Sequence, residues 1–178
     1  MKTNSKNKGS RFERAVAKWF EDWTGYKFSR TPGSGGWAKS KDSFGDIVCT
    51  DEKHGRRFPF SIECKNYRDI NFEHILLGAK SCKVKSFWDQ ALHDASRCNK
   101  IPILIMKYNG MPKGEGFLIT TQEVAVLISK QMSPESGRFM AVANRHLGID
   151  VIVLMLSDIK SEVKYDVLYK EVKKLLKK

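Results

Sequence analysis

Apolar and polar residues alternate along this chain in patterns that predict helices and strands in turn. Between residues 9 and 24, apolar side chains recur at intervals of three and four, which is typical of an amphipathic helix with one buried face. The same spacing predicts helices at residues 83–98 and 121–130, and a lysine-rich helix at residues 165–177. Residues 66–80 show no sustained period and are predicted to be irregular or briefly helical.

Two segments carry the clearest strand signals. Residues 57–65 alternate strictly, with Phe58, Phe60, Ile62 and Cys64 on one face and polar residues on the other. Residues 101–108 form a continuous apolar run, as a central buried strand requires. Weaker extended segments are predicted at residues 26–31, 44–50, 116–120 and 150–156.

The order of these elements predicts an α/β fold. The turn at residues 51–55 joins residues 44–50 to residues 57–65 as an antiparallel hairpin. One helix, three strands, a second helix and two further strands then read as a mixed central β-sheet flanked by helices. With 178 residues, we expect a single domain with a core at about residues 8–121 and a C-terminal extension at about residues 122–178.

Charge changes this picture by suggesting a partner. Lys and Arg number 32 against 20 Asp and Glu, a formal net charge of +12. The excess is concentrated in residues 1–41, which hold ten basic and three acidic side chains. Such a field attracts phosphate backbones, although a merely soluble basic surface is the simpler alternative. The sequence therefore favours a nucleic-acid partner without proving one.

Several classes of protein do not fit the sequence. No run of about 18 apolar residues occurs, and the polar N-terminus lacks the apolar region of a signal peptide, so we expect a cytoplasmic protein with no membrane partner. The four cysteines form no CxxC pair, which argues against a structural zinc site. The glycine-rich residues 32–36 lack the GxxxxGK[ST] pattern of a nucleotide-binding loop.

The hairpin carries the residues with the strongest chemical signal. Glu63 and Lys65 lie two residues apart on one strand and therefore on one face, and antiparallel pairing can bring Asp46 beside Glu63. Two carboxylates are hard oxygen ligands suited to Mg²⁺ or Mn²⁺. A neighbouring lysine can orient a water molecule or stabilise charge on a phosphate. This constellation is typical of metal-assisted phosphodiester hydrolysis.

Each of these residues also has a structural interpretation. Ser10 and Glu13 match a helix capping box, in which Glu13 would only close the first helical turn. Glu63 and Lys65 alone would make a weak surface ion pair, worth about 0–1 kcal/mol. Gln90, on the helix after the motif, is more simply explained as an exposed glutamine than as a polar helper of the site.

These residues resemble the PD-(D/E)xK nuclease superfamily. The likeness rests on Gly45-Asp46, then Glu63-Cys64-Lys65, with the hairpin between them and a helix after them. Within that superfamily the chain is most similar to archaeal-type Holliday-junction resolvases, through residues 8–14 and the loop at residues 30–35. The resemblance covers about residues 8–108, and the chain beyond residue 116 is longer than the resolvase pattern.

The resemblance implies roles for particular residues. Asp46, Glu63 and Glu13 are expected to be catalytic and to bind Mg²⁺, or Mn²⁺ in its place, together with the backbone carbonyl of Cys64. Lys65 is expected to position or activate the attacking water. The residues expected to contact DNA are Lys8, Arg11, Arg14, Arg30, Ser34, Lys39 and Lys41.

The resulting hypothesis is a metal-dependent DNA endonuclease. Its most specific form is a homodimeric resolvase that cuts four-way (Holliday) junctions by paired symmetric nicks. Two alternatives stay open at this point. One is a nuclease of the same superfamily that acts on linear duplex, flap or single-stranded DNA. The other is a non-catalytic basic DNA-binding protein whose acids are structural.

Overall fold

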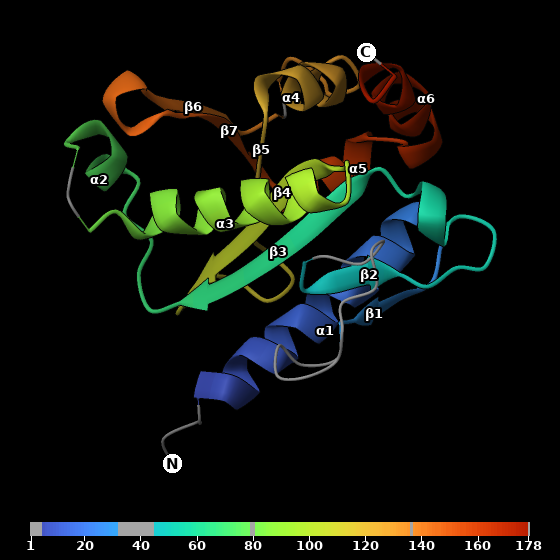
Figure 1. Cartoon of the computed structure of the whole chain (residues 1–178), viewed down its shortest axis with the longest axis horizontal. Helices are drawn as coiled ribbons and strands as arrows, with labels where there is room; N and C mark the ends of the chain where they lie inside the picture. The colour runs from blue at the N-terminus through green and yellow to red at the C-terminus, as the bar shows by residue number, and fades with distance from the viewer. Residues whose placement is uncertain (1–4, 32–44, 79–80, 136, 178) are drawn as a thin grey trace.

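A seven-stranded mixed sheet forms the centre of the molecule (Figure 1). The computed structural model describes residues 5–31, 45–78, 81–135 and 137–177. The strand order is β1-β2-β3-β4-β5-β7-β6, and every neighbouring pair is antiparallel except β3 and β4. The strands are β1 (Phe28–Arg30), β2 (Ile47–Cys49), β3 (Phe60–Tyr67), β4 (Ile101–Tyr108), β5 (Phe117–Thr120), β6 (Phe139–Asn144) and β7 (Ile149–Met155).

Helices cover both faces of this sheet. The α-helices are α1 (Ser5–Thr24), α2 (Glu73–Leu76), α3 (Lys83–Arg97), α4 (Gln122–Ser129), α5 (Leu156–Glu162) and α6 (Tyr165–Leu175). Two short 3₁₀ helices, η1 (Gly55–Arg57) and η2 (Arg145–Leu147), lie in connections. The apolar residues of α1, α4, α5 and α6 share one core with one face of the sheet, and those of α2 and α3 share a second core with the other face.

The parallel pair β3 and β4 sits in the middle and is joined by α3, as a parallel connection requires. Ile62 on β3 is buried in the core beneath α1, while the next residue, Glu63, points to the face that α3 covers. The alternation of this strand predicts a polar second face, and a solvated face is the structural alternative. Both faces are in fact covered, which is why Glu63 is only 2% exposed.

The fold class expected from the sequence is confirmed, because the sheet is mixed and flanked by helices. Predicted bounds agree with the structure to within a few residues for most elements. The largest shift at a helix start is in α1, which begins at Ser5 rather than at residue 9. The division into a core at residues 8–121 and an extension at residues 122–178 stays a prediction. No described helix has both the length and the apolar character that a bilayer span needs.

Two elements were not predicted. Strand β6 lies at the sheet edge and buries only Val142, so it lacks the alternation that reveals a half-buried strand. Helix α5 begins at Leu156, directly after β7, with no turn residue between them. The sequence therefore reads Leu156 as the last residue of a strand.

An aromatic cluster attaches α1 to the strands that it covers. Phe20 is fully buried and packs edge-on against Trp19 and Phe58, with ring centroids 5.0 and 6.1 Å away. The ring of Phe28, on β1, lies 5.4 Å from Phe20. Because these residues come from α1, β1 and the segment before β3, the cluster fixes the helix relative to the first three strands.

Replacing Phe20 by alanine should therefore destabilise the protein by about 3–5 kcal/mol, the usual result of removing a buried aromatic side chain. Urea denaturation followed by circular dichroism measures the change. The matched control is Phe139→Ala on β6, where the side chain is 70% exposed and the change should stay within about 0.5 kcal/mol. Equal effects of the two substitutions would contradict this packing.

Candidate active site

The backbone around Asp46 is held tightly against β3. Gly45 has a φ of +97°, and a Cβ atom at this position would lie 2.5 Å from the carbonyl oxygen of Ile62. No residue other than glycine fits there without displacing one of the two segments. The amide of Asp46 then donates to the same Ile62 oxygen at 2.8 Å. The close approach of this segment to β3 therefore requires glycine at position 45, next to Asp46.

Thr31 holds the same segment from the other side. Its amide donates to the carbonyl oxygen of Asp46 at 2.9 Å, and its hydroxyl donates to that of Gly45 at 2.8 Å. The sequence places Asp46 in the middle of a strand, whereas the structure places it in a bend immediately before β2. The bend frees its side chain from the regular alternation of the sheet.

The carboxylate of Asp46 points toward β3. The amide of Cys64 donates to its Oδ2 at 2.9 Å, and this amide belongs to the peptide that follows Glu63. Ile47 pairs with Ile62, so the antiparallel register places Asp46 next to Glu63. The structure therefore brings together the two acids that the sequence singles out.

Glu63 is buried between β3 and α3. Its Oε1 accepts hydrogen bonds from Lys65 Nζ and from Gln90 Nε2, the latter at 2.6 Å. Gln90 is exposed, as the sequence predicts, but its side-chain amide also reaches from α3 to the carboxylate and so contacts the site. Lys65 also lies over the ring of Phe87, 5.4 Å from its centroid, and its side chain is 20% exposed.

Burial and like charge make Glu63 reluctant to ionise. Burial is the larger cause and the charge of Asp46 the next, and together they raise the pKa of Glu63 to about 7. Lys65 opposes this shift, and Asp94 on α3 adds to it. The site thus concentrates negative charge in a place where water cannot screen it.

Burial raises the pKa values of Asp46 and Cys64 as well. Burial also raises the pKa of Asp46, against the opposing effects of the Cys64 amide and of Lys65. The thiol of Cys64 is buried, and burial holds its pKa well above the ordinary value. Cys64 therefore offers no thiolate, and its contribution to a metal site is limited to the main chain.

Glu13 approaches this cluster from α1. Its charge adds a smaller contribution to the raised pKa of Asp46, which is due first to burial. Its Oε2 accepts a hydrogen bond from Arg30 Nε in an ion pair. The capping-box interpretation is wrong, because α1 starts at Ser5 and both Ser10 and Glu13 lie inside the helix.

Three of the residues expected to contact DNA lie on the first half of α1, and Arg30 ends β1. Lys8 donates to Asn109 Oδ1 beside the turn after β4, while Arg11 and Arg14 are exposed. Arg30 is engaged with Glu13. The remaining predicted contacts lie outside the described residues: Ser34, Lys39 and Lys41.

The donor set fits a hard divalent cation. Asp46 and Glu63 supply carboxylate oxygens at one place, and their mutual repulsion is the kind of strain that a bound cation relieves. Within residues 5–31, 45–78, 81–135 and 137–177, no three His, Cys, Asp or Glu side chains already converge as metal ligands. The third acid, Glu13, is held by Arg30 instead. The fit therefore rests on the Asp46–Glu63 pair.

Sequence reasoning missed the residues that shape this site. Gly45 was noted only as the neighbour of Asp46, although its positive φ and its contact with Ile62 set the geometry. Thr31 gave no signal, because a threonine after a short strand has many explanations. Gln90 had one available signal. It lies on the predicted helix that follows the motif, where a polar side chain can face the sheet.

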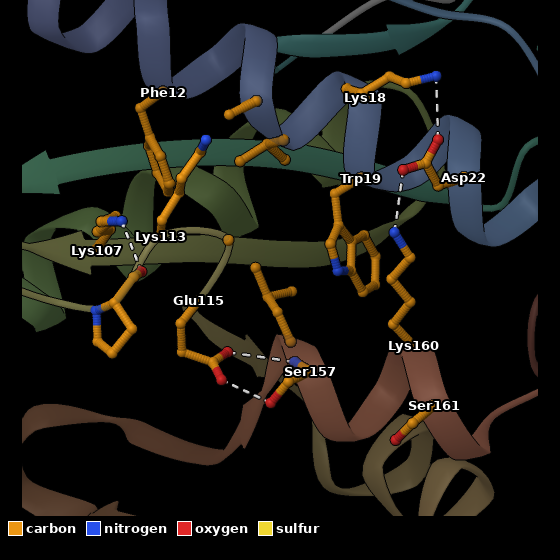
Figure 2. Close-up of a pocket in the computed structure, with 15 residues that line it drawn as sticks. Phe12, Lys18, Trp19, Asp22, Lys107, Lys113, Glu115, Ser157, Lys160 and Ser161 are labelled. Atoms are coloured by element: carbon orange, nitrogen blue, oxygen red, sulfur yellow. Dashed lines mark hydrogen bonds and ion pairs between the residues drawn. The ribbon is translucent and has the colours of Figure 1, made fainter.

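A cavity of about 770 Å³ lies elsewhere, between α1, the turn after β4 and α5. Figure 2 shows Asp22 between Lys18 and Lys160, which it pairs with at 3.0 Å each. Glu115 is likewise engaged, accepting from the hydroxyl of Ser157 at 2.6 Å. The Asp22–Lys160 pair ties α5 to α1, and the Glu115–Ser157 bond ties α5 to the segment before β5. None of the acids of the Asp46 site lines this cavity.

Comparison with known proteins identifies the family. Residues 4–170 match the model of the family described as "Phage putative PDDEXK endonuclease". The chain belongs to this family. It is therefore a member of a nuclease family, as the Gly45-Asp46 and Glu63-Cys64-Lys65 motifs indicate, and DNA is the substrate that such membership implies.

A curated relative shares part of the chain. Protein D14 of Escherichia phage T5 is 30% identical over 107 residues, which make up 60% of this chain and 66% of protein D14. No solved structure matches the chain significantly. The likeness to archaeal-type resolvases is not among these findings, so substrate specificity has to be argued separately.

The raised pKa of Glu63 predicts a pH-dependent stability. Between the ordinary pKa of 4.5 and the folded-state value of about 7, the folded chain keeps a proton that the unfolded chain has lost, so the free energy of unfolding falls as pH rises. Without metal, Glu63→Gln should match the wild type near pH 4.5. At alkaline pH it should be more stable by about 1–3 kcal/mol.

Urea denaturation in EDTA across this pH range measures the difference. Glu52→Gln, at an exposed glutamate of the turn after β2, is the matched control and should leave the pH profile unchanged. A Glu63→Gln protein that is less stable than the wild type at alkaline pH would show that Glu63 stabilises the fold as an ion pair.

Proposed function

We propose that this protein is a divalent-metal-dependent DNA endonuclease whose active site is the Asp46–Glu63–Lys65 cluster. The observation that carries the proposal is the juxtaposition of the half-buried Asp46 with the buried Glu63 and with Lys65 on the same strand as Glu63. Lys65 donates to Glu63, and the Cys64 amide donates to Asp46. Membership of a PDDEXK endonuclease family supports it. If Glu63 and Lys65 formed only a structural ion pair, a second carboxylate beside the buried Glu63 would only add repulsion.

Asp46, Glu63 and the main-chain carbonyl of Cys64 would hold Mg²⁺, or Mn²⁺ in its place, with Glu13 as a further ligand. When bound, the cation supplies Lewis-acid stabilisation of the charge that develops on the phosphate. Buried carboxylates with few other partners suit this task, because the cation compensates the charges that burial disfavours.

Lys65 holds the attacking water in this proposal. Its ammonium group reaches the buried Glu63 while part of its side chain stays exposed, so it lies at the boundary between the carboxylates and solvent. From there it can orient the water and stabilise the negative charge on phosphorus-bound oxygen. The water oxygen forms a bond to phosphorus, one ester P–O bond breaks, and the leaving oxygen takes a proton. Gln90 fixes the Glu63 carboxylate and acts as a positioning residue.

For the substrate, we infer a four-way DNA junction cut by paired symmetric nicks. The support is the resemblance of residues 8–14 and 30–35 to archaeal-type junction resolvases. Paired cuts on a two-fold symmetric substrate require two active sites, so the proposal includes a homodimer. The basic side chains near the start of α1, such as Arg11 and Arg14, would contact phosphates close to the cut.

Variants of the acids test the catalytic assignment. Asp46→Asn and Glu63→Gln should each lower the single-turnover rate of Mg²⁺-dependent nicking by about 100-fold or more, because each removes a charge that holds the cation. Lys65→Ala should lower the rate while leaving Mn²⁺ binding, measured by calorimetry, close to that of the wild type. The controls are Glu52→Gln and Lys53→Ala, at exposed positions of the turn after β2. Normal nicking by both acid variants would leave a DNA-binding protein with structural acids.

A comparison of substrates tests the junction assignment. A synthetic four-way junction should be cut at least about tenfold faster than duplexes of the same arm sequences at equal salt, with nicks at symmetric positions on opposing strands. Sedimentation in the absence of DNA should show a dimer. Faster cutting of duplex, flap or single-stranded DNA would assign the same chemistry to that substrate instead.

A further inference from the structure

A second basic surface lies away from the proposed active site. Two hollows, of about 270 and 250 Å³, are lined by cations from three separate segments of the chain. We call this surface the basic pole and define it by seven residues: Arg56, Arg57, Lys100, Lys170, Lys173, Lys174 and Lys177. No Asp or Glu is among the residues that line the two hollows.

Strand pairing brings the first two segments together. The amide of Ile101 donates to the carbonyl oxygen of Pro59 at 2.9 Å, at the point where β3 and β4 begin. The residues just before these strands, Arg57 from η1 and Lys100 from the turn after α3, therefore lie on the same end of the sheet. Two cations are placed there by the core of the fold.

Helix α6 supplies the third segment. Its apolar face, with Leu168 and Val172, is buried in the core. Lys170, Lys173 and Lys174 lie on one stripe of α6, and Lys177 continues this stripe in the turn just after the helix. The stripe extends for about 10 Å at about 1.5 Å per residue. Figure 1 shows α6 toward the end of the sheet where β3 starts.

A solvated outer face is the simplest explanation of lysines on one helix. It does not explain why cations from η1 and from residue 100 line a hollow together with Lys173 and Lys177. Gathering like charges costs stability, and on the α6 stripe only Lys174 has a described carboxylate partner, Glu171 at 2.7 Å. A surface that accumulates this repulsion fits a polyanion.

We infer that the basic pole is a second contact surface for the DNA backbone. Along one strand of a duplex, phosphates advance by about 3.4 Å of helix axis, so a stripe of about 10 Å matches about three of them. The start of β3 lies about 17 Å from Lys65, at about 3.3 Å per residue, so the pole contacts a different part of the DNA from the part being cut. The inference rests on the proposed function only for the choice of DNA as the polyanion.

Charge reversal tests the inference without any cleavage. In EDTA, Lys173→Glu/Lys177→Glu should weaken binding of the full chain to a fluorescent duplex of about 30 base pairs by about tenfold or more. The slope of log affinity against log salt should fall by about 2, because two phosphate contacts are lost. The matched control is Lys130→Glu/Lys164→Glu, an equal change of net charge at exposed lysines outside the pole, which should change affinity less than about twofold.

Three results would overturn the inference. If both double variants weaken DNA binding equally, the effect is due to net charge. If Lys173→Glu/Lys177→Glu binds DNA as tightly as the wild type, the basic pole does not contact DNA. Loss of binding to phosphatidylserine-containing vesicles, with DNA affinity intact, would assign the surface to lipid. DNA binding is measured in EDTA, without cleavage. The result of this test therefore does not depend on whether the Asp46 and Glu63 variants lose their nicking activity.

Discussion

The repulsion between two neighbouring carboxylates, the buried Glu63 and the half-buried Asp46, is the constraint around which the first half of this molecule is organised. Each element near them limits that repulsion or fixes its geometry. Lys65 donates to Glu63, the Cys64 amide donates to Asp46, and Gly45 lets the bend approach β3 closely enough for the contact of Asp46. An arrangement that is unfavourable by itself is thereby held in place by the sheet.

The cost of that arrangement explains why it suggests function. A protein selected only for stability would place an apolar side chain where Glu63 lies, between β3 and α3. The retained acid has a raised pKa, and the positive charge of a divalent cation would offset both causes of the shift, burial and the charge of Asp46. The same reasoning applies at the basic pole, where like charges gather at the start of β3 and β4. In both places the fold maintains an electrostatic imbalance of one sign that a ligand of the other sign would correct.

The sequence predicted the parts of the structure that depend on strong local periodicity. The amphipathic stripe of α1 and the apolar run of β4 led directly to those elements, and the spacing of Glu63 and Lys65 placed them on one face. Elements without periodicity were missed. The edge strand β6 buries only Val142 among its six residues, so nothing in its pattern distinguishes it from a loop.

The candidate site was predicted by residue type, and its geometry was not. Asp46 and Glu63 were paired correctly, but the burial of Glu63 depends on α3, whose packing over β3 no local pattern reveals. Thr31 and Gln90 act through tertiary contacts with Gly45 and Glu63, which connect residues 14 and 27 positions apart. Such contacts arise only once the sheet has formed. The order of strands, rather than local sequence, therefore decides which side chains support the acids.

The most direct test of the central claim is the pH dependence of Mg²⁺ affinity, measured by calorimetry on the metal-free protein. If the cation binds between Asp46 and Glu63, its binding must release the proton that Glu63 keeps up to a pKa of about 7. The affinity should then rise by about tenfold per pH unit below that value and level off above it. Affinity that does not change with pH, or Mg²⁺ binding that persists in Glu63→Gln, would contradict the account.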